Sequence, residues 1–125
     1  MGLDQYAEWT EAEHDPESEE TTYTEFKYWR KASHIQDFFQ KIYAEKTGIT
    51  DPYEFNCVKV EIDYDVLNRF ITAVKTNAMT PVGGFLFGAK YDANASAVVE
   101  SDLRFAADCF FHLLMGRRVW YKSSW

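Results

Sequence analysis

The stretch Phe55-Asn-Cys-Val-Lys-Val-Glu-Ile-Asp-Tyr-Asp-Val-Leu-Asn-Arg-Phe-Ile71 changes its hydrophobic period halfway along. Apolar and polar residues alternate as far as Ile62, which predicts a strand over 55–62 with one buried face. After Asp63 or Asp65, apolar residues recur every three or four positions, which predicts a helix beginning at these acids. A strand that leads directly into a helix indicates a fold that mixes both in one core. The residues expected to face that core are Val58, Val60, Ile62, Leu67, Phe70, Ile71 and Val74.

A second helix is expected before this unit, over residues 32–46. Ser33 is placed to cap its start, and Gly48 to end it. Its apolar residues fall at i, i+3, i+4, i+7 and i+8, so they form a single stripe along the helix. That stripe consists of Ile35, Phe38, Phe39, Ile42 and Tyr43.

The ends of the chain add further elements to this unit. Residues 3–9 and 22–30 predict strands, and the apolar run Gly84–Gly88 predicts a short buried strand. A third helix is expected over Asp102–Met115, capped by Ser101 and stopped by Gly116, and a last strand over 117–123. The side chains expected to face inward from the third helix are Leu103, Ala106, Phe110, Leu113 and Leu114. The order predicts an α/β (or α+β) two-layer sandwich, with a four- to five-stranded sheet packed against three helices in one domain over 1–125.

Charge is unevenly distributed along the 125 residues. Residues 1–26 carry nine acids and no Lys or Arg, whereas the remainder carries 11 acids and 13 bases. We expect an acidic loop at about 10–21, with Glu17, Glu19 and Glu20 on an acidic surface. The absence of a basic stripe argues against a direct nucleic-acid partner.

The sequence shows no feature of a membrane or secreted protein. No apolar run approaches the ~20 residues that span a bilayer, and the N-terminus does not resemble a signal peptide. Cys57 and Cys109 lack the spacing of a disulfide framework or a metal site, so we expect two free, buried thiols. The predicted location is the cytoplasm.

Catalytic motifs are incomplete. The Gly83–Lys90 segment approaches a phosphate-binding loop, but Ala89 occupies the place of its lysine. The three histidines have no metal-ligand spacing, and Asp63 and Asp65 suit the first turn of a helix better than acid–base chemistry. We therefore expect no catalytic residue, metal or cofactor, and the sequence leans away from an enzyme without excluding one.

Two aromatic and polar clusters are the candidate binding residues. The first is Tyr28-Trp29-Arg30-Lys31 and the second is the C-terminal segment 119–125. If their strands are neighbours, they line one cleft in which Arg binds an anion and the aromatic rings stack. In the alternative interpretation, the aromatic rings belong to the core and the two bases pair with the acidic stretch. The full candidate set is Trp29, Arg30, Lys31, Gln36, Asn56, Tyr121, Ser124 and Trp125.

The chain resembles a group of small phage and bacterial proteins. The shared features are the start Met1–Asp4, Tyr28–Lys31, Phe55–Cys57, the Gly84–Gly88 run and the end Tyr121–Trp125. The positions that match are Trp29, Arg30, Lys31, Asn56, Cys57, Phe87, Gly88, Ser124 and Trp125. Members often carry the name phosphoglycerate kinase, but 125 residues cannot supply the two large domains that such a kinase needs.

One departure from this group bears on catalysis. Its first helix usually has His after Ile or Leu, whereas Ile35 is followed here by Gln36. Glutamine is not a general acid or base at neutral pH, although it can orient a ligand by hydrogen bonding.

These observations predict a non-enzymatic binding protein of phage or prophage type. It would modulate a host or defence component, either by docking on a protein or by sequestering a small anionic, nucleotide-like ligand. An alternative is a small enzyme acting on a phosphorylated small molecule or nucleotide, with Arg30 and Lys31 holding phosphate. A further alternative is a structural or assembly protein that forms a homodimer through exposed aromatic residues.

Overall fold

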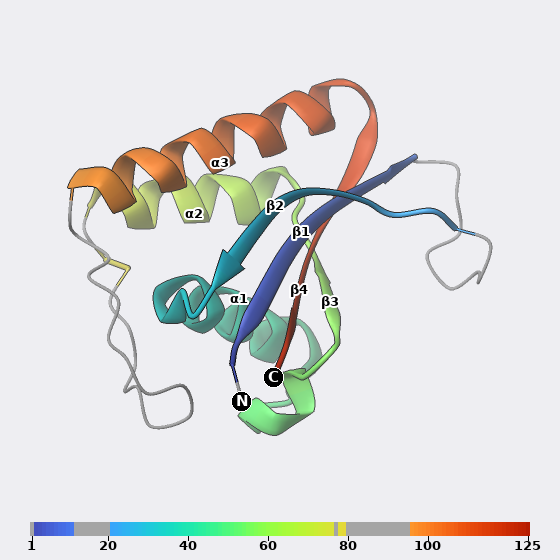
Figure 1. Ribbon diagram of the computed structural model, residues 1–125, viewed down its shortest axis with the longest axis vertical. Coiled ribbons are helices and arrows are strands. Elements are labelled where there is room, and N and C mark those ends of the chain that lie inside the picture. Colours follow the sequence, from blue (N-terminus) through green and yellow to red (C-terminus); the bar gives the residue numbers. More distant parts are fainter. Residues whose placement is uncertain (1, 12–20, 77, 80–95) are drawn as a thin grey trace.

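A four-stranded antiparallel sheet organises the protein, as the computed structural model shows for residues 2–11, 21–76, 78–79 and 96–125. The strands lie in the order β2-β1-β4-β3. They comprise β1 (Asp4–Glu11), β2 (Thr24–Arg30), β3 (Lys59–Glu61) and β4 (Arg117–Ser124). The first and last strands are therefore the two central ones, and the two ends of the chain lie close together (Figure 1).

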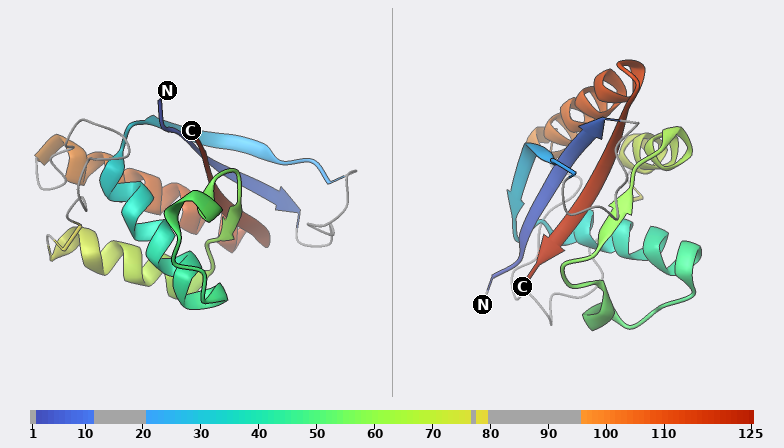
Figure 2. Two further views of the ribbon diagram at one scale, coloured as in Figure 1. Left: turned by 90° about the horizontal axis from the view of Figure 1, so that it is seen from below. Right: turned by 90° about the vertical axis from the view of Figure 1, so that its right-hand side faces the viewer.

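Three helices cover one face of this sheet (Figure 2). They are α1 (Ser33–Thr47), α2 (Tyr64–Lys75) and α3 (Ser96–Leu114), and a short 3-10 helix, η1 (Pro52–Phe55), precedes β3. This arrangement confirms the predicted sandwich of a sheet and three helices, in its α+β form, because every described strand pair is antiparallel.

Aromatic rings fill the space between the sheet and the helices. Tyr121 projects from β4 and stacks on Phe39 of α1, with the ring centroids 4.2 Å apart. Phe105 of α3 meets Trp29 edge-on at 4.7 Å and Phe70 of α2 at 5.6 Å. All five rings are buried, so this cluster joins the sheet to each of the three helices.

The strand predicted over 55–62 is wrong in its first half. Phe55 ends η1, which Pro52 begins and the side chain of Asp51 caps by accepting the Tyr53 N–H. Cys57 has a φ of 63°, a left-handed conformation that interrupts an extended chain. Only Lys59–Glu61 pairs with β4, although Val60 and Ile62 are buried as expected. Cys57 is exposed, which contradicts its predicted burial, whereas Cys109 is buried; both thiols are free.

Two predicted N-caps are also wrong. Ser101 lies inside α3, which begins at Ser96 rather than Asp102. Ser33 is the first residue of α1, and the preceding Ala32 has no capping side chain of its own. By contrast, Asp63 caps α2 as predicted, because its carboxylate accepts the Val66 N–H at 2.9 Å.

Glycine ends two helices as the sequence predicts. Gly48 and Gly116 have φ values of 77° and 78°, in the left-handed region where glycine carries no side-chain penalty. The predicted strand Gly84–Gly88 and the Gly83–Lys90 segment lie outside the described residues. Among the helices of the described ranges, none is long and apolar enough to cross a membrane.

Candidate functional site

The two predicted binding clusters lie at the same end of the sheet but on strands that do not touch. Asp4 of β1 is the cross-strand partner of both Arg30 of β2 and Ser124 of β4. The three side chains therefore form a row on the sheet face opposite the helices, with β1 between the two clusters. The condition for a shared cleft, that β2 and β4 be neighbours, is not met.

Arg30 and Lys31 are exposed where the chain leaves β2 for α1. Lys31 has a φ of 58°, so the chain turns sharply between the strand and the helix. On the neighbouring strand, Asp4 accepts a hydrogen bond from the Tyr28 hydroxyl, and this bond raises the pKa of Tyr28. The acids Glu17, Glu19 and Glu20, proposed to pair with these bases or to form an acidic surface, lie outside the described residues.

Three of the predicted binding residues are buried in the protein interior: Trp29, Gln36 and Tyr121. Gln36 and Tyr121 take part in a buried hydrogen-bond network there. The Tyr121 hydroxyl donates to Oε1 of Gln36 at 2.6 Å and accepts from Nε2 of Gln5 at 2.9 Å. Gln5 also accepts the N–H of Ala32 at 2.8 Å and donates to its carbonyl at 2.9 Å. This glutamine of β1 thus holds the start of α1, which lacks a capping side chain of its own.

Burial keeps two potentially reactive groups of the interior in their neutral forms. It raises the pKa of the Tyr121 hydroxyl, so this group remains a hydrogen-bond donor to Gln36. It also raises the pKa of the Cys109 thiol, with a smaller contribution from the charge of Asp108. A neutral buried thiol packs as a small apolar group rather than acting as a nucleophile.

Asn56 fastens the C-terminus to the core. Its Oδ1 accepts the N–H of Trp125 at 3.1 Å, and its Nδ2 donates to the Trp125 carbonyl at 3.3 Å. The Trp125 ring packs against the hydrophobic core. For these two residues the structure shows a structural role, and their predicted ligand contact stays a prediction.

A buried pair joins the first turn of α1 to the middle of α3. Nε2 of His34 lies 2.9 Å from Oδ2 of Asp102, and the two side chains are 1% and 3% exposed. The sequence gives no metal-ligand spacing for His34 and no role for Asp102 beyond starting a helix. Their partnership depends on residues 68 positions apart, so sequence spacing does not reveal it.

The exposed apolar residues of α3 are the surface feature that sequence reasoning missed. Phe110, expected to face inward, is 46% exposed, and Leu114 is 64% exposed. Their neighbours Phe111 and Met115 are exposed as well, and Tyr64 of α2 lies edge-on to Phe110 at 6.1 Å. We call the exposed residues Phe110, Phe111, Leu114 and Met115, together with Val99, Leu103 and Ala107, the apolar α3 surface.

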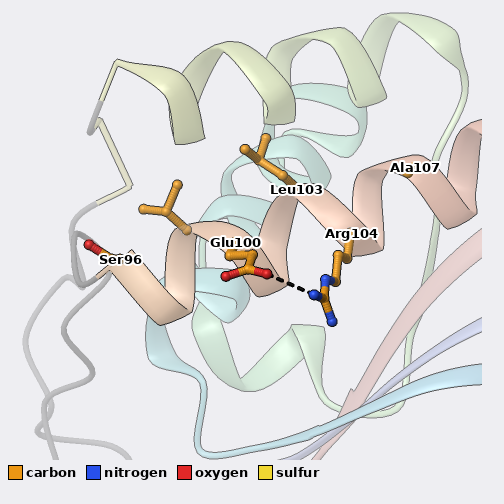
Figure 3. Close-up of a pocket in the computed structure, with 6 residues that line it drawn as sticks. Ser96, Glu100, Leu103, Arg104 and Ala107 are labelled. Atoms are coloured by element: carbon orange, nitrogen blue, oxygen red, sulfur yellow. Dashed lines mark hydrogen bonds and ion pairs between the residues drawn. The ribbon is translucent and has the colours of Figure 1, made fainter.

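A shallow depression of about 540 Å³ continues this surface toward the start of α3 (Figure 3). Its apolar floor is formed by Val99, Leu103 and Ala107. Glu100 and Arg104 lie beside it and are joined by an ion pair of 2.7 Å. Val99 and Leu103 are half-buried and also pack against the core, so apolar groups that are at least partly exposed follow this side of α3 along nearly its whole length.

The sequence contains a signal for this surface. Leu103, Ala107, Phe110 and Leu114 are spaced by four, three and four residues, the a/d spacing of a helix that packs against another helix. Phe105 and Cys109, which are buried in the core, lie on a different side of the same helix. A helix with apolar residues on two sides has more apolar surface than its own core can cover.

An aromatic cluster borders the C-terminal end of this surface. The Arg117 guanidinium lies 4.1 Å from the Trp9 ring centroid and donates to Nδ1 of His112 at 3.1 Å. The His112 ring also contacts Trp9, Phe26 and Phe111, at centroid distances of 5.6, 4.6 and 5.3 Å. Partial burial and the charge of Arg117 lower the pKa of His112, and Asp108 opposes them in part.

Acidification is therefore expected to destabilise the protein through His112. Because the pKa of His112 in the folded protein is below its usual value of about 6.5, the unfolded chain binds more protons than the folded one between these two pKa values. The contribution of His112 is fully present above about pH 6.5 and is lost as the pH falls toward the lowered pKa. Urea unfolding of the wild type and of His112→Asn, each at about pH 7.5 and about pH 5.5, checks this prediction. Equal losses of stability in the two proteins on acidification would contradict it.

Within the described ranges, no group of three or more His, Cys, Asp or Glu side chains is arranged to bind a metal ion. No protein-family model matches the sequence, and no curated protein or solved structure is significantly similar to the chain.

Proposed function

We propose that the protein acts by binding another polypeptide through the apolar α3 surface, without catalysing a reaction. The observation that carries the proposal is the exposure of four large apolar side chains on consecutive turns at one helix end. Exposed apolar groups gathered in one patch are typical of protein-interaction sites, whereas scattered ones are ordinary.

The composition of the surface and of its border supports the proposal. Phe, Trp and Arg are enriched at protein interfaces, and here Phe111 and Trp9 both contact the His112 ring while Arg117 lies over Trp9. The side chains of two acid–base candidates from the sequence, Asp63 and Asp65, make other contacts. Asp63 caps α2, and Asp65 lies 3.9 Å from Arg69.

The two finer expectations from the sequence remain part of the proposal. The resemblance to small phage and bacterial proteins makes a host or defence component one candidate for this polypeptide. Sequestration of a small anionic ligand would instead rely on Arg30 and Lys31, which are exposed at the opposite end of the sheet from Arg117.

Native mass spectrometry after gentle purification from the protein's own cells tests the proposal. A bound polypeptide is expected at defined stoichiometry with the wild type, and Leu114→Glu is expected to lose it because a carboxylate replaces an apolar contact. Tyr53→Glu is the matched control, since Tyr53 is 63% exposed in η1, outside the apolar α3 surface. A wild type that carries no polypeptide, or a Leu114→Glu variant that keeps it, would overturn the proposal.

A further inference from the structure

We infer that the polypeptide bound by the apolar α3 surface is a second copy of this chain, paired helix to helix. The inference rests on the proposed function and names its partner. It is carried by the pattern of large and small side chains on α3 and by the charges beside them.

The a/d spacing fixes which residues would meet. With Leu103 and Phe110 at d positions and Ala107 and Leu114 at a positions, an antiparallel pair related by a two-fold axis brings a positions opposite d positions. Ala107 then faces Phe110 of the second copy, and Leu103 faces Leu114. We call these four a and d positions the seam. Its smallest residue, Ala107, therefore packs against its largest, Phe110, and both contacts occur twice by symmetry.

The open depression supplies the room for this contact. It lies over Leu103 and Ala107, the positions that receive Leu114 and Phe110 of the second copy. Phe110 and Leu114 project from the other half of the same helix and are 46% and 64% exposed. One half of the surface is therefore a shallow depression and the other half carries projecting side chains, which is the shape complementarity that a self-complementary interface needs.

Charges beside the seam match the same register. Arg104 follows Leu103 and comes level with Phe111 of the second copy, where a guanidinium is attracted to an aromatic face. Glu100 comes level with the end of α3 in the second copy, where Arg117 begins β4. The first pair is a cation–π contact and the second is an attraction between opposite charges, and each occurs twice by symmetry.

Long-range charge does not oppose the association. The nine acids of residues 1–26 account for the negative charge of the chain, and residues 27–125 carry 13 bases against 11 acids. The part of the chain that contains α3 is therefore nearly neutral, so two copies approach without strong repulsion between their bodies.

Sedimentation equilibrium over a range of concentrations tests the inference. The wild type is expected to sediment at twice the 14.6 kDa of one chain. Ala107→Glu is expected to weaken dimerisation by about 100-fold or more, because it places a carboxylate and extra volume against Phe110 of the second copy. Ala107 is exposed in a helix and Glu is a good helix former, so the monomer retains its fold. Ala97→Glu, the same change at another exposed α3 position, is the matched control and should leave the dimer intact.

An exchange of the large and small residues tests the register itself. Ala107→Phe opposes two Phe rings, and Phe110→Ala leaves two Ala residues facing a gap, so each single variant should dimerise weakly. The double variant restores one large and one small residue at each contact and should recover the dimer. A double variant that stays as weak as the singles would overturn the proposed pairing.

The remaining outcomes separate this inference from the proposed function. A wild type that is monomeric up to millimolar concentration, yet loses a different bound polypeptide on Leu114→Glu, would overturn the inference and leave the proposed function standing. A monomer that carries no polypeptide would overturn both.

Discussion

Asp102→Ala is expected to lower the free energy of unfolding by roughly 3–5 kcal/mol, the usual consequence of removing one partner from a buried pair of ionisable groups. The carboxylate lies 2.9 Å from Nε2 of His34, and both side chains are almost fully buried. Without Asp102, this nitrogen loses a buried hydrogen-bond partner. The change also separates the first turn of α1 from the middle of α3.

Urea denaturation monitored by tryptophan fluorescence and circular dichroism measures this loss. Asp108→Ala removes an exposed carboxylate from the same helix and should change stability by less than about 0.5 kcal/mol. The double variant His34→Leu with Asp102→Leu should recover much of the loss, since a buried apolar pair can replace a buried polar one. An Asp102→Ala variant as stable as Asp108→Ala would contradict the structural importance of the pair.

Local patterns account for the parts of the fold that the sequence predicts well. The stripe from Ile35 to Tyr43 identifies α1, and Gly48 and Gly116 mark the ends of α1 and α3, because helix periodicity and glycine conformation are properties of neighbouring residues. The strand at 55–62 is the exception. The expected strand includes Cys57, yet the chain there is left-handed, since η1 and the short pairing of β3 with β4 are set by tertiary contacts.

The candidate site depends on contacts that sequence spacing does not contain. The sequence leaves two places open for Trp29 and Tyr121, a cleft shared with Arg30 or the hydrophobic core. Because β1 separates β2 from β4, the condition for the shared cleft fails, and both aromatic side chains are buried in the core. The residues of a single strand do not determine which other strands lie beside it in the sheet. The apolar α3 surface is different, because its a/d spacing is present in the sequence. Assigning Phe110 and Leu114 to the core concealed it, although one helix face cannot bury both them and Phe105 with Cys109.

Gln5→Leu is expected to be the second strongly destabilising change, at roughly 2–4 kcal/mol, because it removes several buried hydrogen bonds at once. The carboxamide of Gln5 is fully buried and joins Ala32 at the start of α1 to Tyr121 of β4. Leucine has a similar volume, so the loss arises from the polar groups left behind rather than from a cavity. The Ala32 carbonyl still accepts from the amides of Ile35 and Gln36, whereas its N–H loses the Gln5 oxygen.

A double-mutant cycle with Tyr121→Phe separates the two halves of this network. Tyr121→Phe removes the hydroxyl that joins Gln5 to Gln36 but leaves the Gln5–Ala32 clamp in place, so it should cost about 1–2 kcal/mol, less than Gln5→Leu. Because the two residues share a hydrogen bond, the double variant should lose less stability than the sum of the singles, by about 0.5 kcal/mol or more. Additive losses would show that Gln5 and Tyr121 are not coupled. A Gln5→Leu variant at least as stable as Tyr121→Phe would show that Gln5 does not hold the start of α1. In that case the backbone of the turn at Lys31 would hold the start of α1, because the Lys31 carbonyl accepts the Ser33 N–H at 3.0 Å.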